Sequence, residues 1–115
     1  MARGIYSDTF QISSNTDTAV VAAPGAGERI YVKYVKISVA TAGTGSRARV
    51  ENGAGGDVIL RAATTAADSS AEFYGDQGEG RNYAGYALSE NTALNVNTSG
   101  SGAATIDVVV RWEVR

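Results

Sequence analysis

The amino-acid sequence predicts an all-β protein, and three observations carry this prediction. First, residues 105–114 place apolar side chains at every second position, which is the period of a strand with one buried face. Second, roughly eight or nine short segments rich in β-branched and aromatic residues recur along the chain, separated by Gly, Asn and Ser turns. Third, no segment shows a convincing helical period. The pattern is typical of an antiparallel β-sandwich or barrel.

Turn residues bound each expected strand. A short strand is expected around Phe10 and Ile12, and the polar cluster at 13–17 ends it. Pro24 closes the next apolar run, because proline removes a backbone donor that a sheet interior requires. Residues 63–70 are expected to form a loop or a poor strand, since alanines and β-branched residues are mixed there. The remaining strands are expected at 19–23, 28–40, 47–51, 58–62, 72–74, 83–89, 94–96 and 105–114.

The long strand at 28–40 changes phase in its middle. Apolar side chains alternate on one parity up to Tyr34 and on the opposite parity from Val35 onward. One extra residue moves every later side chain to the other face, so a β-bulge or sharp bend is predicted at Tyr34–Val35. The inward positions of all strands give the expected core: Val20, Ile30, Val32, Ile37, Val39, Val50, Val58, Leu60, Phe73, Leu88, Leu94, Val96, Ile106, Val108, Val110 and Trp112.

Composition limits the classes of partner. The 115 residues suit one domain, and a hydrophobic share of 43% suffices for a core. Charged residues make up only 19%, and small neutral polar residues are plentiful. Such a surface suits a protein that meets other proteins over much of its area, and it suits an ordinary Gly/Ser-rich β-domain equally well. The net charge of −2, with dispersed basic residues, predicts no nucleic-acid partner and no membrane partner.

Neither end of the sequence suggests export or membrane insertion. The start Met-Ala-Arg-Gly lacks the apolar region of a signal peptide. No apolar run approaches the roughly 18 residues of a membrane span. A soluble protein made in a cytoplasm is expected.

The residue inventory argues against an enzyme. The chain has no histidine and no cysteine, the usual sources of proton transfer at neutral pH, nucleophilic attack and transition-metal binding. The acidic residues occur singly, so no catalytic residues and no cofactor are expected. The glycine groups at 53–56 and 75–80 lack the context of a phosphate-binding loop and are expected to be turns. Asp68, Asp76 and Glu79 could offer oxygens to calcium, but the EF-hand spacing is absent and solvated loops are favoured, so no metal is expected.

The chain is expected to divide into an extended N-terminal arm, residues 1–17, and a β-sandwich domain, residues 18–115. The arm cannot bury its few apolar side chains alone, so it gains stability by lying along a neighbouring molecule, for example by adding a strand to an exposed edge. A frayed terminus is the alternative interpretation. The candidate partner-binding residues are Arg3, Ile5, Tyr6 and Phe10.

Three sequence motifs resemble those of a known family. Gly27–Val32 opens a long strand after a Pro-Gly turn, Leu88–Val96 precedes a Ser-Gly hairpin, and the alternating last strand ends in Arg111–Val114. Over about residues 18–115 this layout resembles the small jelly-roll proteins of tailed bacteriophages, above all the head decoration, or capsid cement, proteins. Fibre tips, receptor-binding knobs and tumour-necrosis-factor-like trimers share the same strand rhythm.

The resemblance implies a jelly-roll-like β-sandwich with a structural function and no catalytic residues. It implies a homo-oligomer, with a trimer favoured, that binds the major capsid protein on the capsid exterior of the virion and stabilises contacts between capsid subunits. The protein would be made in the host cytoplasm. The alternative is a fibre-tip or receptor-binding module that recognises a host surface glycan or protein.

Overall fold

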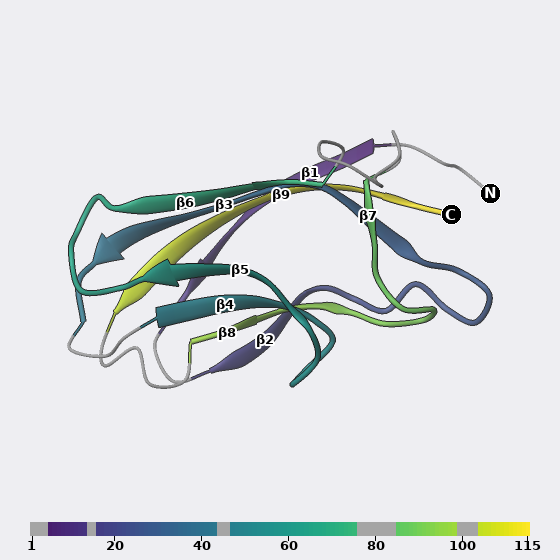
Figure 1. The fold of residues 1–115 in the computed structure, drawn as a ribbon, viewed down its shortest axis with the longest axis horizontal. Helices are drawn as coiled ribbons and strands as arrows, with labels where there is room; N and C mark the ends of the chain where they lie inside the picture. Colours follow the sequence, from purple (N-terminus) through teal and green to yellow (C-terminus); the bar gives the residue numbers. More distant parts are fainter. Residues whose placement is uncertain (1–4, 14–15, 44–46, 76–84, 99–103) are drawn as a thin grey trace.

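A computed structural model of the chain describes residues 5–13, 16–43, 47–75, 85–98 and 104–115. These residues form nine strands, and the strands build two antiparallel sheets that pack face to face (Figure 1). None of the described residues belongs to a helix, and so none lies in a helix that could cross a membrane. The expected all-β sandwich is confirmed.

The two sheets contain five and four strands. The first sheet has the order β1 (Ile5–Ile12), β9 (Thr105–Val114), β3 (Ile30–Thr41) and β6 (Ser70–Tyr74), and the short β7 (Tyr86–Ala87) also pairs with β3. The second sheet has the order β2 (Asp17–Val21), β8 (Leu94–Asn97), β4 (Arg47–Asn52) and β5 (Val58–Ala63).

The strand pairs are nested along the sequence. The hairpin β4·β5 is innermost, and β3·β6, β2·β8 and β1·β9 enclose it in turn. Successive pairs fall in alternate sheets, so the chain forms one long antiparallel ribbon that is wrapped around a core. This wrapping is the jelly-roll arrangement that the family resemblance implies.

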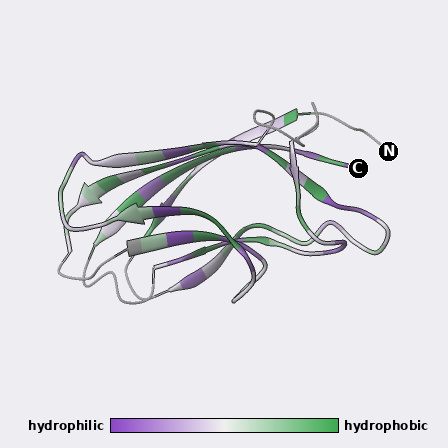
Figure 2. Ribbon diagram, viewed as in Figure 1, coloured by the Kyte–Doolittle hydropathy of each residue, from purple (hydrophilic) through white to green (hydrophobic). Residues whose placement is uncertain are grey.

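Alternating burial builds the core between the sheets. Figure 2 shows hydrophobic and hydrophilic bands that alternate along the strands, as expected for sheets with one buried face. Most of the expected core is confirmed, and four of its members are only partly buried: Val58, Leu60, Phe73 and Trp112. Six further apolar residues are buried that the expected core does not contain: Ile12, Val21, Val35, Ala48, Ala62 and Ala104.

The predicted phase change in β3 is confirmed one residue earlier than expected. Val32 lies opposite Trp112 and Tyr34 lies opposite Arg111, so Lys33 is the extra residue of a bulge. Val32 and Val35 are therefore both fully buried although three positions separate them. At the same point β6 and β7 share the edge of β3, and the Gly75 amide donates to the Lys33 carbonyl at 2.8 Å.

Several strand boundaries differ from expectation: β1 begins at Ile5, before the expected strand around Phe10 and Ile12, β3 begins at Ile30 and β6 at Ser70. The strand expected at 19–23 is β2, Asp17–Val21, because a register shift between Ala19 and Val21 turns two consecutive valines inward and the chain then leaves the sheet. The strand expected at 83–89 is represented by the two residues of β7, and residues 83–84 lie outside the described part. Of residues 63–70, expected to form a loop or a poor strand, residues 64–69 form no strand, whereas Ala63 ends β5 and Ser70 begins β6.

Candidate partner-binding surface

The segment expected to be an N-terminal arm forms β1 at the edge of the first sheet. Each of its eight residues pairs with β9, from Ile5 opposite Glu113 to Ile12 opposite Ile106. The segment thus lies along its own chain, whereas a neighbouring molecule was expected, because one side of β9 needs a strand to satisfy its backbone groups. The expected division between residues 17 and 18 falls inside β2.

The structure separates the predicted partner-binding residues. Phe10 is half-buried and packs against the core. The ring of Tyr6 stacks on Trp112 with centroids 5.5 Å apart, and 43% of Tyr6 remains exposed. Ile5 has the opposite parity, faces away from the core and is 57% exposed. Arg3 lies outside the described residues.

The outer side of β1 has no strand partner among the described residues. One of its amides is already occupied, because the Thr9 N–H donates to the Asp8 carboxylate at 2.8 Å. A carboxylate in this position hinders the addition of another strand. The strand still presents apolar side chains, and two of the three large hydrophobic residues described as exposed belong to it: Ile5 and Tyr6.

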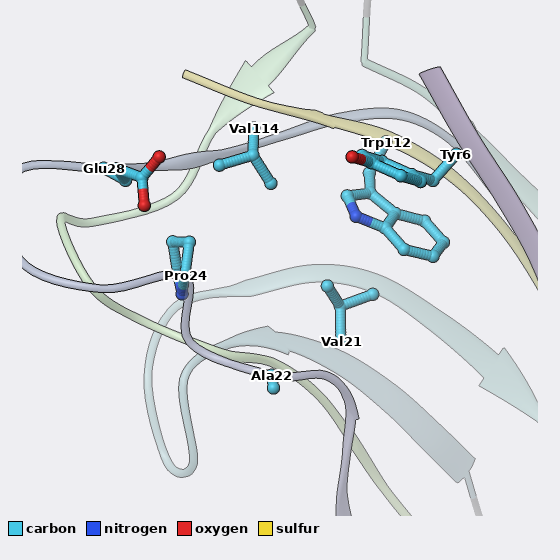
Figure 3. A pocket seen from close by; sticks show the side chains of 7 residues that line it. All are labelled: Tyr6, Val21, Ala22, Pro24, Glu28, Trp112 and Val114. Carbon is cyan, nitrogen blue, oxygen red and sulfur yellow. The ribbon is translucent and has the colours of Figure 1, made fainter. Parts of the chain in front are cut away.

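A cleft of about 380 Å³ opens beside β1, between the two sheets (Figure 3). Stacked aromatic rings from β1 and β9 form one end, and the connection between β2 and β3 forms the other. The lining is mainly apolar and comprises Tyr6, Val21, Ala22, Pro24, Glu28, Trp112 and Val114. Trp112 was expected in the core and no role was predicted for Glu28. Nothing in the sequence indicates that these two residues line one cleft.

Three polar groups face this cleft. Figure 3 shows the indole nitrogen of Trp112 and the hydroxyl of Tyr6 directed into it, with the carboxylate of Glu28 at the opposite end. None of these three side-chain groups has a hydrogen-bond or ion-pair partner among the described residues. The cleft therefore offers two donors at one end, one anion at the other, and an apolar passage between them.

Backbone hydrogen bonds fix the Glu28 end of the cleft. The Glu28 amide donates to the Gly25 carbonyl at 3.1 Å and closes a turn, in which Gly25 and Gly27 have positive φ. The turn is tied to a second turn, because the Asn91 amide donates to the Glu28 carbonyl at 2.8 Å and the Gly27 amide donates to the Glu90 carboxylate at 2.9 Å. The backbone that carries the Glu28 side chain is thus held in place by two connected turns.

Aromatic and charged side chains cover the outer face of the first sheet. Tyr34 and Tyr74 lie opposite each other on β3 and β6, with ring centroids 5.1 Å apart. Both hydroxyls donate to the Glu72 carboxylate, at 2.5 and 3.1 Å. Both side chains face outward, away from the core. This exposed cluster, Tyr34–Glu72–Tyr74, is a second surface suited to a protein partner.

The tyrosine cluster predicts a specific titration. The hydrogen bond to Glu72 is the main factor that raises the pKa of Tyr34, from 10.0 to about 12. Because the folded-state pKa is raised, the stabilisation that this hydroxyl provides is complete below pH 10 and is lost as the pH rises toward 12. We expect Glu72→Gln to return the pKa of Tyr34 toward 10, as measured by NMR titration of the tyrosine ring carbons. A Tyr34 pKa that stays near 12 in this variant would contradict the assignment.

The outward face of β9 carries the charges that the sequence predicts there. Arg111 is exposed. The carboxylate oxygen Oε1 of Glu113 lies 3.5 Å from Nζ of Lys33, and the carboxylate also contacts Nε of Arg115. The hydrogen bond from Arg115 is the main factor that lowers the pKa of Glu113 below its usual value. The guanidinium of Arg115 also lies over the ring of Tyr31, 6.0 Å from its centroid. Glu113 is therefore paired with two basic side chains at this end of the sheet.

The described residues contain no group of three His, Cys, Asp or Glu side chains arranged to hold a metal ion. Asp68 is exposed at a turn with a φ of 65°, and Asp76 and Glu79 lie outside the described residues. Gly53 and Gly55 have positive φ in the connection between β4 and β5, which confirms the turn interpretation of that glycine group. Residues 76–80 of the other glycine group lie outside the described part.

Comparison with known proteins assigns the chain to no family. No family model matches the sequence, and no curated protein matches it. Among solved structures, the chain is similar to one described under the words "Bacillus endospore appendages form a novel family of disulfide-linked pili". The TM-score is 0.44 and the identity is 13%, over 98% of this chain and 89% of the other. The two packed sheets define the chain as a β-sandwich protein. The likeness to the appendage protein is too distant to specify a function.

Proposed function

We propose that this protein is a structural virion protein, a decoration protein that binds the outside of a phage capsid and stabilises contacts between major capsid subunits. The observation that supports the proposal is the exposed apolar edge at Ile5 and Tyr6 on a compact jelly-roll sandwich. Exposed apolar side chains beside a polar surface are typical of protein interaction sites.

A decoration protein requires a surface complementary in shape to the capsid and contacts with several capsid subunits. A compact domain that touches more than one capsid subunit gains avidity, since the second contact forms within an existing complex. Binding to the assembled lattice alone would stabilise that lattice by linkage. A homo-oligomer, with a trimer favoured, multiplies these contacts further, and light scattering of the purified protein measures its mass.

The decisive experiment follows occupancy on capsids. We expect Ile5→Lys to lower the affinity for purified heads at least tenfold, because a charge replaces an apolar contact at the proposed interface. The fold should be retained, since Ile5 is exposed and the residue opposite it, Glu113, is acidic and does not repel a lysine. Ala63→Lys, on the exposed side of β5 in the other sheet, is the matched control. Unchanged occupancy of the Ile5 variant would remove β1 from the interface.

The alternative function, a fibre-tip or receptor-binding module, is favoured by the cleft beside Trp112, which is a site for a ligand group rather than a flat contact. Copy number separates the two functions. Quantitative mass spectrometry of purified virions should give a fixed, high ratio of this chain to the major capsid protein for a decoration protein. A few copies at a vertex or tail would support the alternative and contradict the main proposal.

A further inference from the structure

We propose that the cleft between Trp112 and Glu28 binds a lysine or arginine side chain presented by an extended segment of a partner polypeptide. The inference goes beyond the proposed function, because it specifies the chemistry of an occupant for a site separate from the outward-facing Ile5. Three observations support it: the apolar lining of the cleft, the polar groups in the cleft that have no partner among the described residues, and the charges around it.

Charge complementarity identifies the cation. Glu28 is half-buried at one end of the cleft and has no ion-pair partner in the described part of the chain. The carboxylate of Glu90 lies nearby, where it accepts the Gly27 amide. Two carboxylates with no described ion pair make this end of the cleft a region of negative potential.

The basic side chains of adjacent segments are engaged elsewhere. Arg29 follows Glu28 directly, but its guanidinium donates to the Leu88 carbonyl at 3.1 Å. Arg115 pairs through its backbone with Arg29, and its side chain lies with Glu113 and Tyr31 on the outer face of the sheet. Neither of these side chains neutralises Glu28 in the described part of the chain, and a cation supplied by a partner is complementary to this carboxylate.

The middle of the cleft fits an aliphatic stem. Val21, Ala22, Pro24 and Val114 line it, and a lysine or arginine side chain buries its methylene groups along such a surface while its charged end reaches a carboxylate. An isolated metal cation or a small ammonium ion would leave this apolar lining unused. The shape and the charge together favour a long basic side chain.

The aromatic end supplies contacts for the backbone that carries this side chain. The indole N–H of Trp112 and the hydroxyl of Tyr6 point into the cleft, and each can donate to a backbone carbonyl of an extended peptide. A backbone carbonyl of the bound peptide would accept from Trp112 or Tyr6 at one end of the cleft. The ammonium or guanidinium group of its basic side chain would meet the Glu28 carboxylate at the other end. The site thus distinguishes a peptide-borne basic side chain from an uncharged one.

Fluorescence offers a direct test, because Trp112 is the only tryptophan of the chain. The probes are acetylated and amidated pentapeptides with a central lysine, arginine or norleucine between alanines, added to the full-length protein at low ionic strength. We expect the lysine and arginine peptides to shift the emission saturably and to move the single indole N–H resonance in NMR spectra. Norleucine keeps the stem and lacks the charge, so its peptide should bind at least tenfold more weakly.

Variants assign the effect to the cleft. Glu28→Gln preserves size and removes the charge, and it should weaken binding of the lysine peptide at least tenfold. Asp57→Asn removes an exposed carboxylate in the connection between β4 and β5 and should change binding less than twofold. The proposal is overturned by equal affinity for the norleucine peptide, by unchanged binding to the Glu28 variant, or by saturable binding of oligosaccharides when all peptides fail. Capsid occupancy of the Ile5 variant tests the proposed function separately.

Discussion

Replacement of Gly75 by alanine is expected to destabilise the fold by about 3–5 kcal/mol, which is a large effect for one methyl group. A Cβ at this position would lie 1.7 Å from the Val32 carbonyl oxygen and 2.9 Å from the Tyr86 amide nitrogen. Both atoms belong to the backbone, so no side-chain rotation relieves the clash. The alternative is to break the contact between Gly75 and the β3 bulge, where the Gly75 amide donates to the Lys33 carbonyl.

Gly27→Ala is the matched control for this prediction. At Gly27, as at Gly75, the substitution only adds a methyl group. The φ of +81° disfavours alanine, but no heavy atom lies within 4 Å of an added Cβ. We expect a cost of about 1–2 kcal/mol from backbone conformation alone. Urea unfolding curves measure both variants. Equal costs would show that close approach to Val32 contributes nothing beyond the general penalty for replacing glycine.

Ile37→Ala is expected to cost about 2–5 kcal/mol, because Ile37 is fully buried in the middle of β3. Its neighbours in the sheet are Val108 on β9 and Ala71 on β6, so the lost methylene groups leave a cavity at the centre of the sandwich. Since total stabilities are about 5–15 kcal/mol, this substitution removes a large share of the margin. Thermal unfolding followed by circular dichroism gives the loss as a lowered midpoint.

The neighbouring residue provides the comparison. Ser38→Ala changes the same strand on the opposite, outward face and should alter stability by less than about 0.5 kcal/mol. If the two substitutions had similar effects, the inward assignment of Ile37 would be wrong.

Strand positions were predictable because burial imposes a period of two on the sequence. The last strand was expected at 105–114 and β9 spans Thr105–Val114, since one face of this strand meets the core along most of its length. The β3 bulge was visible as a change of parity, although its position was misplaced by one residue. The extra residue, Lys33, lies between Val32 and Tyr34, and the change of parity alone does not decide whether Lys33 or Tyr34 is the residue added to the strand.

The sheet order and the site were not predictable in the same way. Residues 1–17 look like an arm because β1 is an edge strand, with one face partly solvated and little apolar content of its own. Removal of residues 2–9 would consequently delete more than half of a paired strand and uncover Trp112, so this deletion is unsuitable as a test of binding alone. The cleft arises from β1, β9 and the connection after β2, and contacts over such sequence separations leave no local signal.

The nested pairing has a consequence for biosynthesis. β9 lies between β1 and β3, so the last of the nine described strands in the sequence occupies an interior place in the first sheet. During synthesis β1 has no strand partner until β9 has been made. The second sheet can therefore assemble before the first is complete. Folding of this kind depends on contacts between strands that lie far apart in the sequence, β1 and β9, which makes it slow and sensitive to the loss of β9.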